Sequence, residues 1–219
     1  MNESKYLKLS KELQELSKSI PLKWGNIQNN TTDSKLNLFE IDSKNQLEIE
    51  IKNFSEKDKN YFRRRWFIWQ CARVDEYLFY KNNNVKQNSN PKDQNWDIEF
   101  NNEKKLRFDI KGTIVPKSLR ANFKISDEKK IIDFYYQNQS KGIRYKIQNR
   151  LFIVHHSFYK EERSIFLRCH WKLKEKAYKH FSELITSTIN FTSYKTAIAK
   201  CIFIIENENN EFSFKINYK

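Results

Sequence analysis

Two short segments between Asn95 and Thr113 alternate strictly between apolar and polar residues. Such alternation is typical of β-strands that bury one face and keep the other polar. We therefore predict a β-hairpin over this stretch, with its turn at residues 102–104. Its packed face is predicted to hold Ile98, Phe100, Leu106, Phe108 and Ile110. Its polar face is predicted to hold Asp97, Glu99, Arg107, Asp109 and Lys111.

The register of this hairpin follows from the same pattern. With an odd-numbered turn, Asp97 faces Asp109, and their Cβ atoms lie roughly 5 Å apart. Glu99 then faces Arg107, which carries the opposite charge. A slip by one residue would turn Asp109 and Lys111 toward the apolar side, so the pattern disfavours it. Two carboxylates this close raise each other's pKa unless a cation lies between them, and a divalent metal ion would suit them.

Apolar residues at helical spacing predict helices elsewhere in the chain. An amphipathic helix over residues 3–20 ends before Pro21, and we expect it to pack against the protein or to form a homodimer contact. Ser55 is a typical N-cap, so a helix that is apolar on two sides is predicted from there to about Asn82. The segment 36–52 fits a strand or a helix, and we favour a helix. Two further helices are predicted, one starting at 126–128 and one over 172–188.

Apolar runs predict the remaining strands. The continuous run at 151–154 is typical of a buried strand, and 165–171 is predicted as another. A closing hairpin is predicted over 197–205 and 212–216, and a polar loop over 82–94. Together these elements predict an α/β fold, in which a mixed central sheet is flanked by helices within a single domain over residues 1–219.

Charge and composition limit the classes of partner and the cellular location that we expect for this protein. The chain of 219 residues has 41 Lys and Arg against 27 Asp and Glu, a net charge of +14. Such a surface attracts nucleic acid or an anionic membrane face, and mere solubility is the alternative explanation of the charge. No apolar run approaches the length of a membrane span, and the three cysteines form no disulfide or zinc pattern. We therefore expect a cytoplasmic protein without membrane contact.

The polar face of the predicted hairpin resembles a known motif. Asp97, a spacer, and then Asp109-Ile110-Lys111 resemble the PD-(D/E)xK motif of restriction-endonuclease-like nucleases. The glycine and threonine that follow the lysine are also familiar in that family. Trp96 departs from the pattern, because the family has proline there. With the upstream helix, the resemblance covers residues 63–113.

The resemblance implies a restriction-endonuclease-like fold and metal-dependent hydrolysis of phosphodiester bonds in DNA. Asp97 and Asp109 would hold Mg²⁺ or Mn²⁺, with the backbone carbonyl of Ile110 as a further ligand. Lys111 would orient the attacking water and neutralise charge at the transition state. Within the family we expect a restriction-type or phage-defence endonuclease that acts on double-stranded DNA.

An acidic residue on the preceding helix often completes the site in this family. Both Glu76 and Asp75 are available, and a carboxylate on a largely buried helix is costly unless it is paired or metal-bound. The two positions lie near different apolar stripes, so the sequence does not decide between them. We prefer Glu76.

Several basic residues are candidates for contacts with phosphate groups: Arg63, Arg64, Arg65, Lys117, Arg120, Lys141 and Arg144. The run at 63–65 is equally consistent with a solvated helix face. The segment 139–146 interleaves basic and aromatic residues, which suits a nucleic-acid backbone as well as it suits a surface turn. His155 and His156 close the strand at 151–154, but no Cys or carboxylate stands at ligand spacing, so a structural role is favoured.

Two other classes of protein fit part of the pattern. A basic nucleic-acid-binding module without catalysis would use the hairpin charges only as cross-strand ion pairs. A purely structural protein would leave both the positive charge and the acidic cluster unexplained. The convergence of Asp97, Asp109 and Lys111 distinguishes a nuclease from both of these classes, because only a nuclease requires it.

Overall fold

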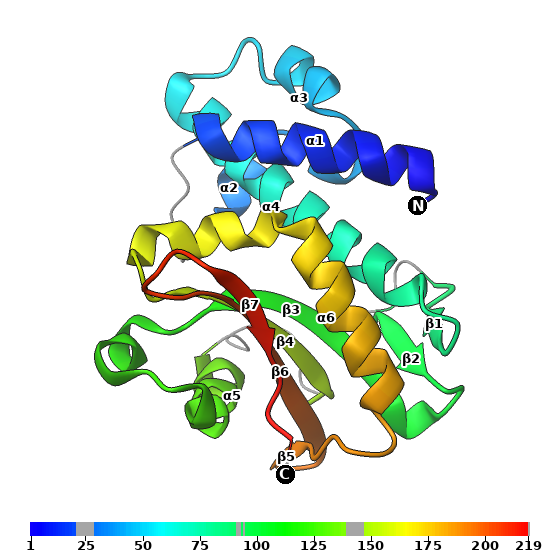
Figure 1. Ribbon diagram of the computed structural model, residues 1–219. Helices are drawn as coiled ribbons and strands as arrows, with labels where there is room; N and C mark the ends of the chain where they lie inside the picture. The colour runs from blue at the N-terminus through cyan, green and yellow to red at the C-terminus, as the bar shows by residue number, and fades with distance from the viewer. Residues whose placement is uncertain (21–28, 91–92, 94, 139–146, 219) are drawn as a thin grey trace. The chain divides into compact units, whose positions relative to one another are not determined.

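Figure 1 shows the computed structural model of the chain, which describes residues 1–20, 29–90, 93, 95–138 and 147–218. The chain divides into two compact units, Met1–Val74 and Asp75–Lys219. In the described residues, the first unit is helical and the second is built around a β-sheet. No helix in these ranges is long and apolar enough to cross a lipid bilayer.

The first unit begins with α1 (Glu3–Ser19), which confirms the helix predicted over residues 3–20. The Asn2 side chain caps it by accepting a 2.9 Å hydrogen bond from the backbone N–H of Lys5. Three leucines form its buried stripe, namely Leu9, Leu13 and Leu16. Leu7 lies off this stripe and is 51% exposed.

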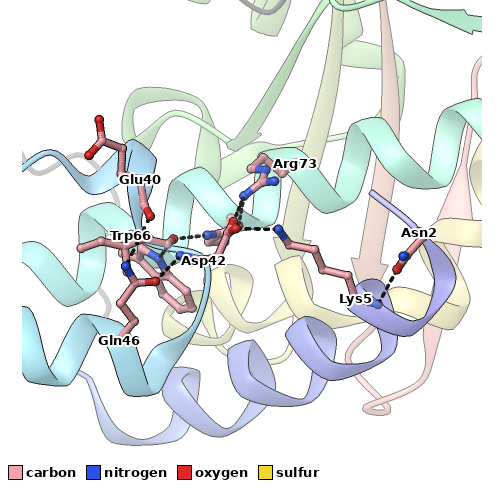
Figure 2. Close-up of polar contacts among 9 residues, drawn as sticks. Asn2, Lys5, Glu40, Asp42, Gln46, Trp66 and Arg73 are labelled. Carbon is pink, nitrogen blue, oxygen red and sulfur yellow. Dashed lines mark hydrogen bonds and ion pairs between the residues drawn. The ribbon is translucent and has the colours of Figure 1, made fainter.

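The segment between α1 and the long helix contains short helices. They are α2 (Asn30–Asp33), the 3₁₀ helix η1 (Leu38–Glu40) and α3 (Lys44–Glu50). The helical interpretation of 36–52 is therefore confirmed, in two pieces rather than one. At the joint between η1 and α3, Asp42 forms ion pairs with Lys5 at 2.8 Å and with Arg73 at 3.1 Å (Figure 2). The Trp66 indole donates a 2.8 Å hydrogen bond to the neighbouring carbonyl of Ile41.

The helix α4 (Glu56–Tyr80) confirms the long helix predicted from Ser55. The Ser55 hydroxyl accepts a 3.2 Å hydrogen bond from the N–H of Asp58, as an N-cap does. Its buried residues include Phe62, Trp66, Phe67, Cys71, Val74 and Leu78. From Asp75 onward the helix belongs to the second unit.

The second unit is organised by a seven-stranded mixed sheet in the order β1-β2-β3-β4-β6-β5, with β7 paired to β6. The strands are β1 (Val85–Gln87), β2 (Ile98–Phe100), β3 (Arg107–Ile114), β4 (Arg150–Ser157), β5 (Thr192–Tyr194), β6 (Ala197–Glu206) and β7 (Phe212–Lys215). β2 runs antiparallel to its neighbours β1 and β3, whereas β3, β4 and β6 are parallel. The predicted closing hairpin is confirmed by β6 and β7.

Helices connect the parallel strands and cover both faces of this sheet (Figure 1). After the 3₁₀ helices η3 (Lys117–Asn122) and η4 (Ile125–Asp127), α5 (Glu128–Asn138) leads to β4, and α6 (Trp171–Leu184) follows β4. α5 packs on one face, where its apolar residues cluster with Phe152 of β4 and Phe203 of β6. α6 packs on the other, where Phe181 contacts Phe100 edge-on at 5.7 Å. The predicted mixed sheet flanked by helices is therefore observed.

The strand predicted over 165–171 is wrong, because these residues lie mainly in the 3₁₀ helix η5 (Glu161–Cys169). Three successive side chains, those of Leu167, Arg168 and Cys169, are buried there, so burial does not follow the two-residue period of a half-buried strand. The polar loop predicted over 82–94 contains the edge strand β1, whose three residues are too few for a visible alternation.

Candidate active site

The predicted hairpin is formed by β2 and β3. Ile98 pairs with Phe108 and Glu99 pairs with Arg107, so the predicted register is confirmed. On the polar face, Arg107 Nε lies 2.5 Å from Glu99 Oε2. The Arg107 guanidinium also lies over the Trp96 ring, 4.5 Å from its centre. The packed face is buried throughout, as predicted.

The connection between the two strands differs from the predicted turn. Asn101 and Asn102 adopt left-handed backbone conformations, with φ of 53° and 56°. Residues Lys104–Leu106 then form a short 3₁₀ helix, η2, before β3 begins. Asparagine tolerates the left-handed region better than most residues, which accounts for this tight exit from β2.

The Asp97 carboxylate is held against β3 at the start of β2. Its Oδ2 accepts a 2.7 Å hydrogen bond from the N–H of Ile110, while the Asp97 N–H donates to the carbonyl of Phe108 at 2.8 Å. Burial and then the charge of Asp109 raise the pKa of Asp97 from 3.8 to about 6. The two carboxyl groups also lie close enough for one, when protonated, to donate a hydrogen bond to the other, which adds to this rise. The two acidic side chains therefore converge.

Asp109 is buried within β3, and each of its carboxylate oxygens has a cation beside it. The Lys111 ammonium donates to Oδ1 at 2.6 Å, and Arg150 Nε lies 3.5 Å from Oδ2. Lys111 is two residues along the same strand and so shares the face of Asp109. The structure thus brings Asp97, Asp109 and Lys111 together.

The oxygen atoms at this site fit a magnesium-type ion. Asp97 and Asp109 supply carboxylates, and the Ile110 carbonyl points to the same side of β3 as the Ile110 N–H, which Asp97 binds. Mg²⁺ is commonly bound by one or two carboxylates, with water and substrate phosphate supplying further oxygens. No three His, Cys, Asp or Glu side chains gather into a metal-binding group within the described ranges. A cation here would therefore depend on the Ile110 carbonyl and on water or phosphate oxygens.

The two acidic candidates on α4 have different surroundings. Asp75 is fully buried, and its Oδ1 lies 2.5 Å from Lys174 Nζ and 2.8 Å from the Tyr178 hydroxyl, both on α6. Glu76 is half-buried. Phe79 of the same helix contacts Phe100 on the packed face of the hairpin, whereas Asp109 lies on the other face, so a place for Glu76 in the site stays a prediction.

The basic residues of α4 are largely engaged within the first unit. Arg63 donates to both carboxylate oxygens of Glu48, at 2.8 and 2.6 Å. Arg65 donates to both oxygens of Asp33, each at 3.3 Å. Arg64 is half-buried. A role for these arginines in phosphate binding stays a prediction, and two of them would have to exchange an acidic partner for phosphate.

The other basic candidates differ in their exposure and in their contacts. Lys117 is exposed on η3. Arg120, also on η3, donates to the carbonyl of Val115 at 2.7 Å and is ion-paired with Glu161. Lys141 and Arg144 lie outside the described residues.

The histidines lie inside β4 rather than at its end. His155 Nδ1 lies 2.8 Å from the carbonyl oxygen of Thr113, and the His156 ring contacts Phe123 edge-on at 4.8 Å. Burial lowers the pKa of His155 well below 6.5 and that of His156 to about 4. Both rings are therefore neutral near pH 7, which agrees with the favoured structural role.

Two arginines that no sequence motif marks lie beside β3. Arg150 begins β4 and pairs in parallel register with Asp109. Arg168 is buried against Gly112, where a Cβ atom would lie only 2.5 Å from the guanidinium. The sequence carries two signals near them, a charged residue directly before the apolar run at 151–154 and a glycine directly after Lys111. Neither signal reveals that Arg150 lies beside Asp109 or that Arg168 lies beside Gly112.

No protein family, curated protein or solved structure matches the chain. The function is therefore inferred from the geometry and charge of the site.

Proposed function

We propose that this protein is a divalent-metal-dependent endonuclease that hydrolyses phosphodiester bonds in DNA. The observation that carries the proposal is the convergence of the Asp97 and Asp109 carboxylates beside the Lys111 ammonium. Holding two carboxylates together at a largely buried position is costly unless a cation compensates them. The resemblance of these residues to the restriction-endonuclease-like motif supports the same assignment, and the mixed sheet flanked by helices is compatible with it.

Each residue of the proposed site has a separate task. Asp97, Asp109 and the Ile110 carbonyl would hold Mg²⁺ or Mn²⁺, with Glu76 in support. Such an ion, when bound, polarises the phosphoryl oxygen and lowers the pKa of a bound water. Lys111 is unbranched and partly exposed, so its ammonium can move from Asp109 to orient the attacking water and to neutralise charge on the phosphate.

The net charge of +14 supports a polyanionic substrate. Positive charge on the surface would hold the phosphate backbone while the acidic pair acts on one phosphodiester. Among nucleases with this motif, a restriction-type or phage-defence enzyme acting on double-stranded DNA is the assignment we favour. A cytoplasmic location and a homodimer built on α1 are parts of the same proposal.

A second candidate function rests on a specific observation. The charges on the hairpin are already paired, Glu99 with Arg107 and Asp109 with Lys111, as in a basic binding module without catalysis. Cross-strand ion pairs do not, however, require Asp97 to lie against Asp109, where the two charges repel. This repulsion is why we favour the nuclease.

The test is to incubate plasmid DNA, single-stranded DNA and RNA with the protein in Mg²⁺, Mn²⁺ or EDTA. The proposal predicts cleavage of DNA with either metal and none in EDTA. Binding without cleavage under every metal condition would support the binding module instead. Cleavage that persists in EDTA would remove the metal from the proposal.

A further inference from the structure

Arg150 occupies an unusual position next to the acidic pair. It begins β4, directly beside Asp109 of β3, and only 5% of the residue is exposed. Its Nε lies 3.5 Å from Asp109 Oδ2, and its guanidinium carbon lies 4.8 Å from the centre of the Tyr136 ring. The guanidinium is therefore held between a carboxylate and an aromatic face.

The Tyr136 ring that packs against Arg150 is held in place by two further contacts. The Tyr136 hydroxyl donates a 2.6 Å hydrogen bond to the carbonyl of Gln148, and its ring stacks on that of Tyr194 at 4.4 Å. α5 carries Tyr136, so the chain between β3 and β4 supplies the ring that backs the arginine. An arginine stacked on a fixed ring has little freedom to leave its carboxylate.

Lys111 and Arg150 differ in what they can reach. The Lys111 side chain is 30% exposed and bonds Oδ1 of Asp109, so it can turn to a substrate. The Arg150 side chain is 6% exposed and lies on the Oδ2 side, away from solvent. A substrate phosphate can therefore reach the lysine but not the arginine.

We propose that Arg150 is a positioning residue that holds the Asp109 carboxylate toward Asp97, so that the acidic pair is already arranged for a divalent cation. This inference rests on the proposed metal-dependent function. Residues that orient metal ligands from behind typically contribute 10–100-fold to metal affinity. Arg150 would also keep Asp109 in place when Lys111 moves to the phosphate.

The sign of the effect separates positioning from simple charge. A fixed positive charge near a cation site repels the cation, so its removal alone should tighten metal binding. If Arg150 instead orients Asp109, its removal should weaken metal binding despite the lost repulsion. Arg150→Met removes the charge and keeps an unbranched side chain. Tyr136→Leu keeps every charge but removes the ring behind the arginine.

The experiment measures the dissociation constant for Mn²⁺ by calorimetry, without nucleic acid, with thermal melting as the folding control. Wild type, Asp109→Asn, Arg150→Met and Tyr136→Leu are compared with Arg107→Met. Arg107 is the matched control because it also stacks on an aromatic ring and pairs with a carboxylate on the same face, but with Glu99 rather than a proposed ligand. We expect Arg150→Met to raise the dissociation constant by about 10–100-fold, Tyr136→Leu to raise it less, and Arg107→Met to leave it unchanged.

Equal or tighter Mn²⁺ binding by folded Arg150→Met overturns the positioning role and leaves the proposed function standing. Failure of wild type to bind Mn²⁺ more tightly than Asp109→Asn overturns the proposed function itself, and the inference falls with it. Should Arg150→Met fail to fold, Tyr136→Leu decides, since unchanged Mn²⁺ binding in that variant contradicts the role. Equal weakening by Arg107→Met would show a general effect of arginine loss and would also overturn it.

Discussion

The backbone N–H of Ile110 donates a 2.7 Å hydrogen bond to the carboxylate of Asp97. This bond ties the acidic residue at the start of β2 to the strand that carries Asp109, and it leaves Asp97 within reach of Asp109. The bond also favours the charged form of Asp97, but burial and the neighbouring charge outweigh it, and the pKa of Asp97 rises to about 6.

The first expectation concerns the stability of the metal-free protein. Because the pKa of Asp97 is raised from 3.8 to about 6, the folded state holds this proton more tightly than the unfolded chain. The contribution of Asp97 to stability should therefore fall as pH rises from 4 to 6 and then level off, a loss of at most about 3 kcal/mol. Asp97→Asn keeps an oxygen for the Ile110 N–H, so it should remove this loss and exceed wild type in stability at pH 7.

Urea unfolding in EDTA at pH 4 and pH 7 measures this difference. Glu103→Gln is the control, because that carboxylate lies on the connection of the same hairpin, where it pairs with the exposed Lys105. An Asp97→Asn protein with the pH dependence of wild type would show that the two carboxylates do not repel.

A second expectation concerns Gly112, which makes room for Arg168. A Cβ atom at this position would lie 2.5 Å from the buried guanidinium, so Gly112→Ala should destabilise the protein by roughly 1–3 kcal/mol. In an Arg168→Met background the crowding atoms are absent, and the same substitution should cost less. Urea unfolding of wild type, the two single variants and the double variant gives the coupling energy between positions 112 and 168. An equal loss of stability in both backgrounds would contradict the contact.

The two acidic residues of α4 should differ in the property that they affect. Asp75→Asn weakens a fully buried ion pair with Lys174, so it should lower stability by about 3–5 kcal/mol. Glu76→Gln should leave the melting temperature near that of wild type but reduce metal-dependent cleavage. Thermal melting and cleavage assays on both variants test this division. A large loss of stability in Glu76→Gln with normal cleavage would assign that residue to the fold.

Salt dependence tests the contribution of single basic residues to nucleic-acid binding. Lys117 is exposed, so Lys117→Ala should weaken DNA binding and reduce the slope of log affinity against log salt by about one unit. Arg63 is already bonded to both oxygens of Glu48, so Arg63→Ala should change the slope less. Fluorescence anisotropy in EDTA measures both. A flat dependence for wild type would remove nucleic acid as the natural partner.

The hairpin could be predicted from sequence because its information is local. Alternation from Ile98 to Ile110 predicts which side chains form the packed face, and burial of that face fixes the register of Glu99 against Arg107. The burial of Glu99 and Asp109 on the opposite face does not follow from it. The positions of Asp97, Asp109 and Lys111 on one face follow directly.

The surroundings of the hairpin could not be predicted in the same way, because they depend on long-range contacts. Arg150 reaches Asp109 only through the parallel pairing of β3 with β4, which is separated from it by α5. Asp75 meets Lys174 only because α6 packs beside the end of α4 within the second unit. The apolar run at 165–171 fits a strand by composition, and only tertiary burial of successive residues makes it a 3₁₀ helix.

Asp109 and Lys111 are proposed to act at one catalytic site, Asp109 as a metal ligand and Lys111 on the phosphate. The most direct test compares plasmid cleavage and DNA binding by wild type, Asp109→Asn and Lys111→Ala in Mg²⁺ and Mn²⁺, with thermal melting to show that each is folded. Wild type should cut. Asp109→Asn should lose both metal binding and cleavage, and Lys111→Ala should keep the metal but lose about 10²–10³ in rate, while both still bind DNA. If wild type cuts and both folded variants cut equally well, the site assigned here is wrong.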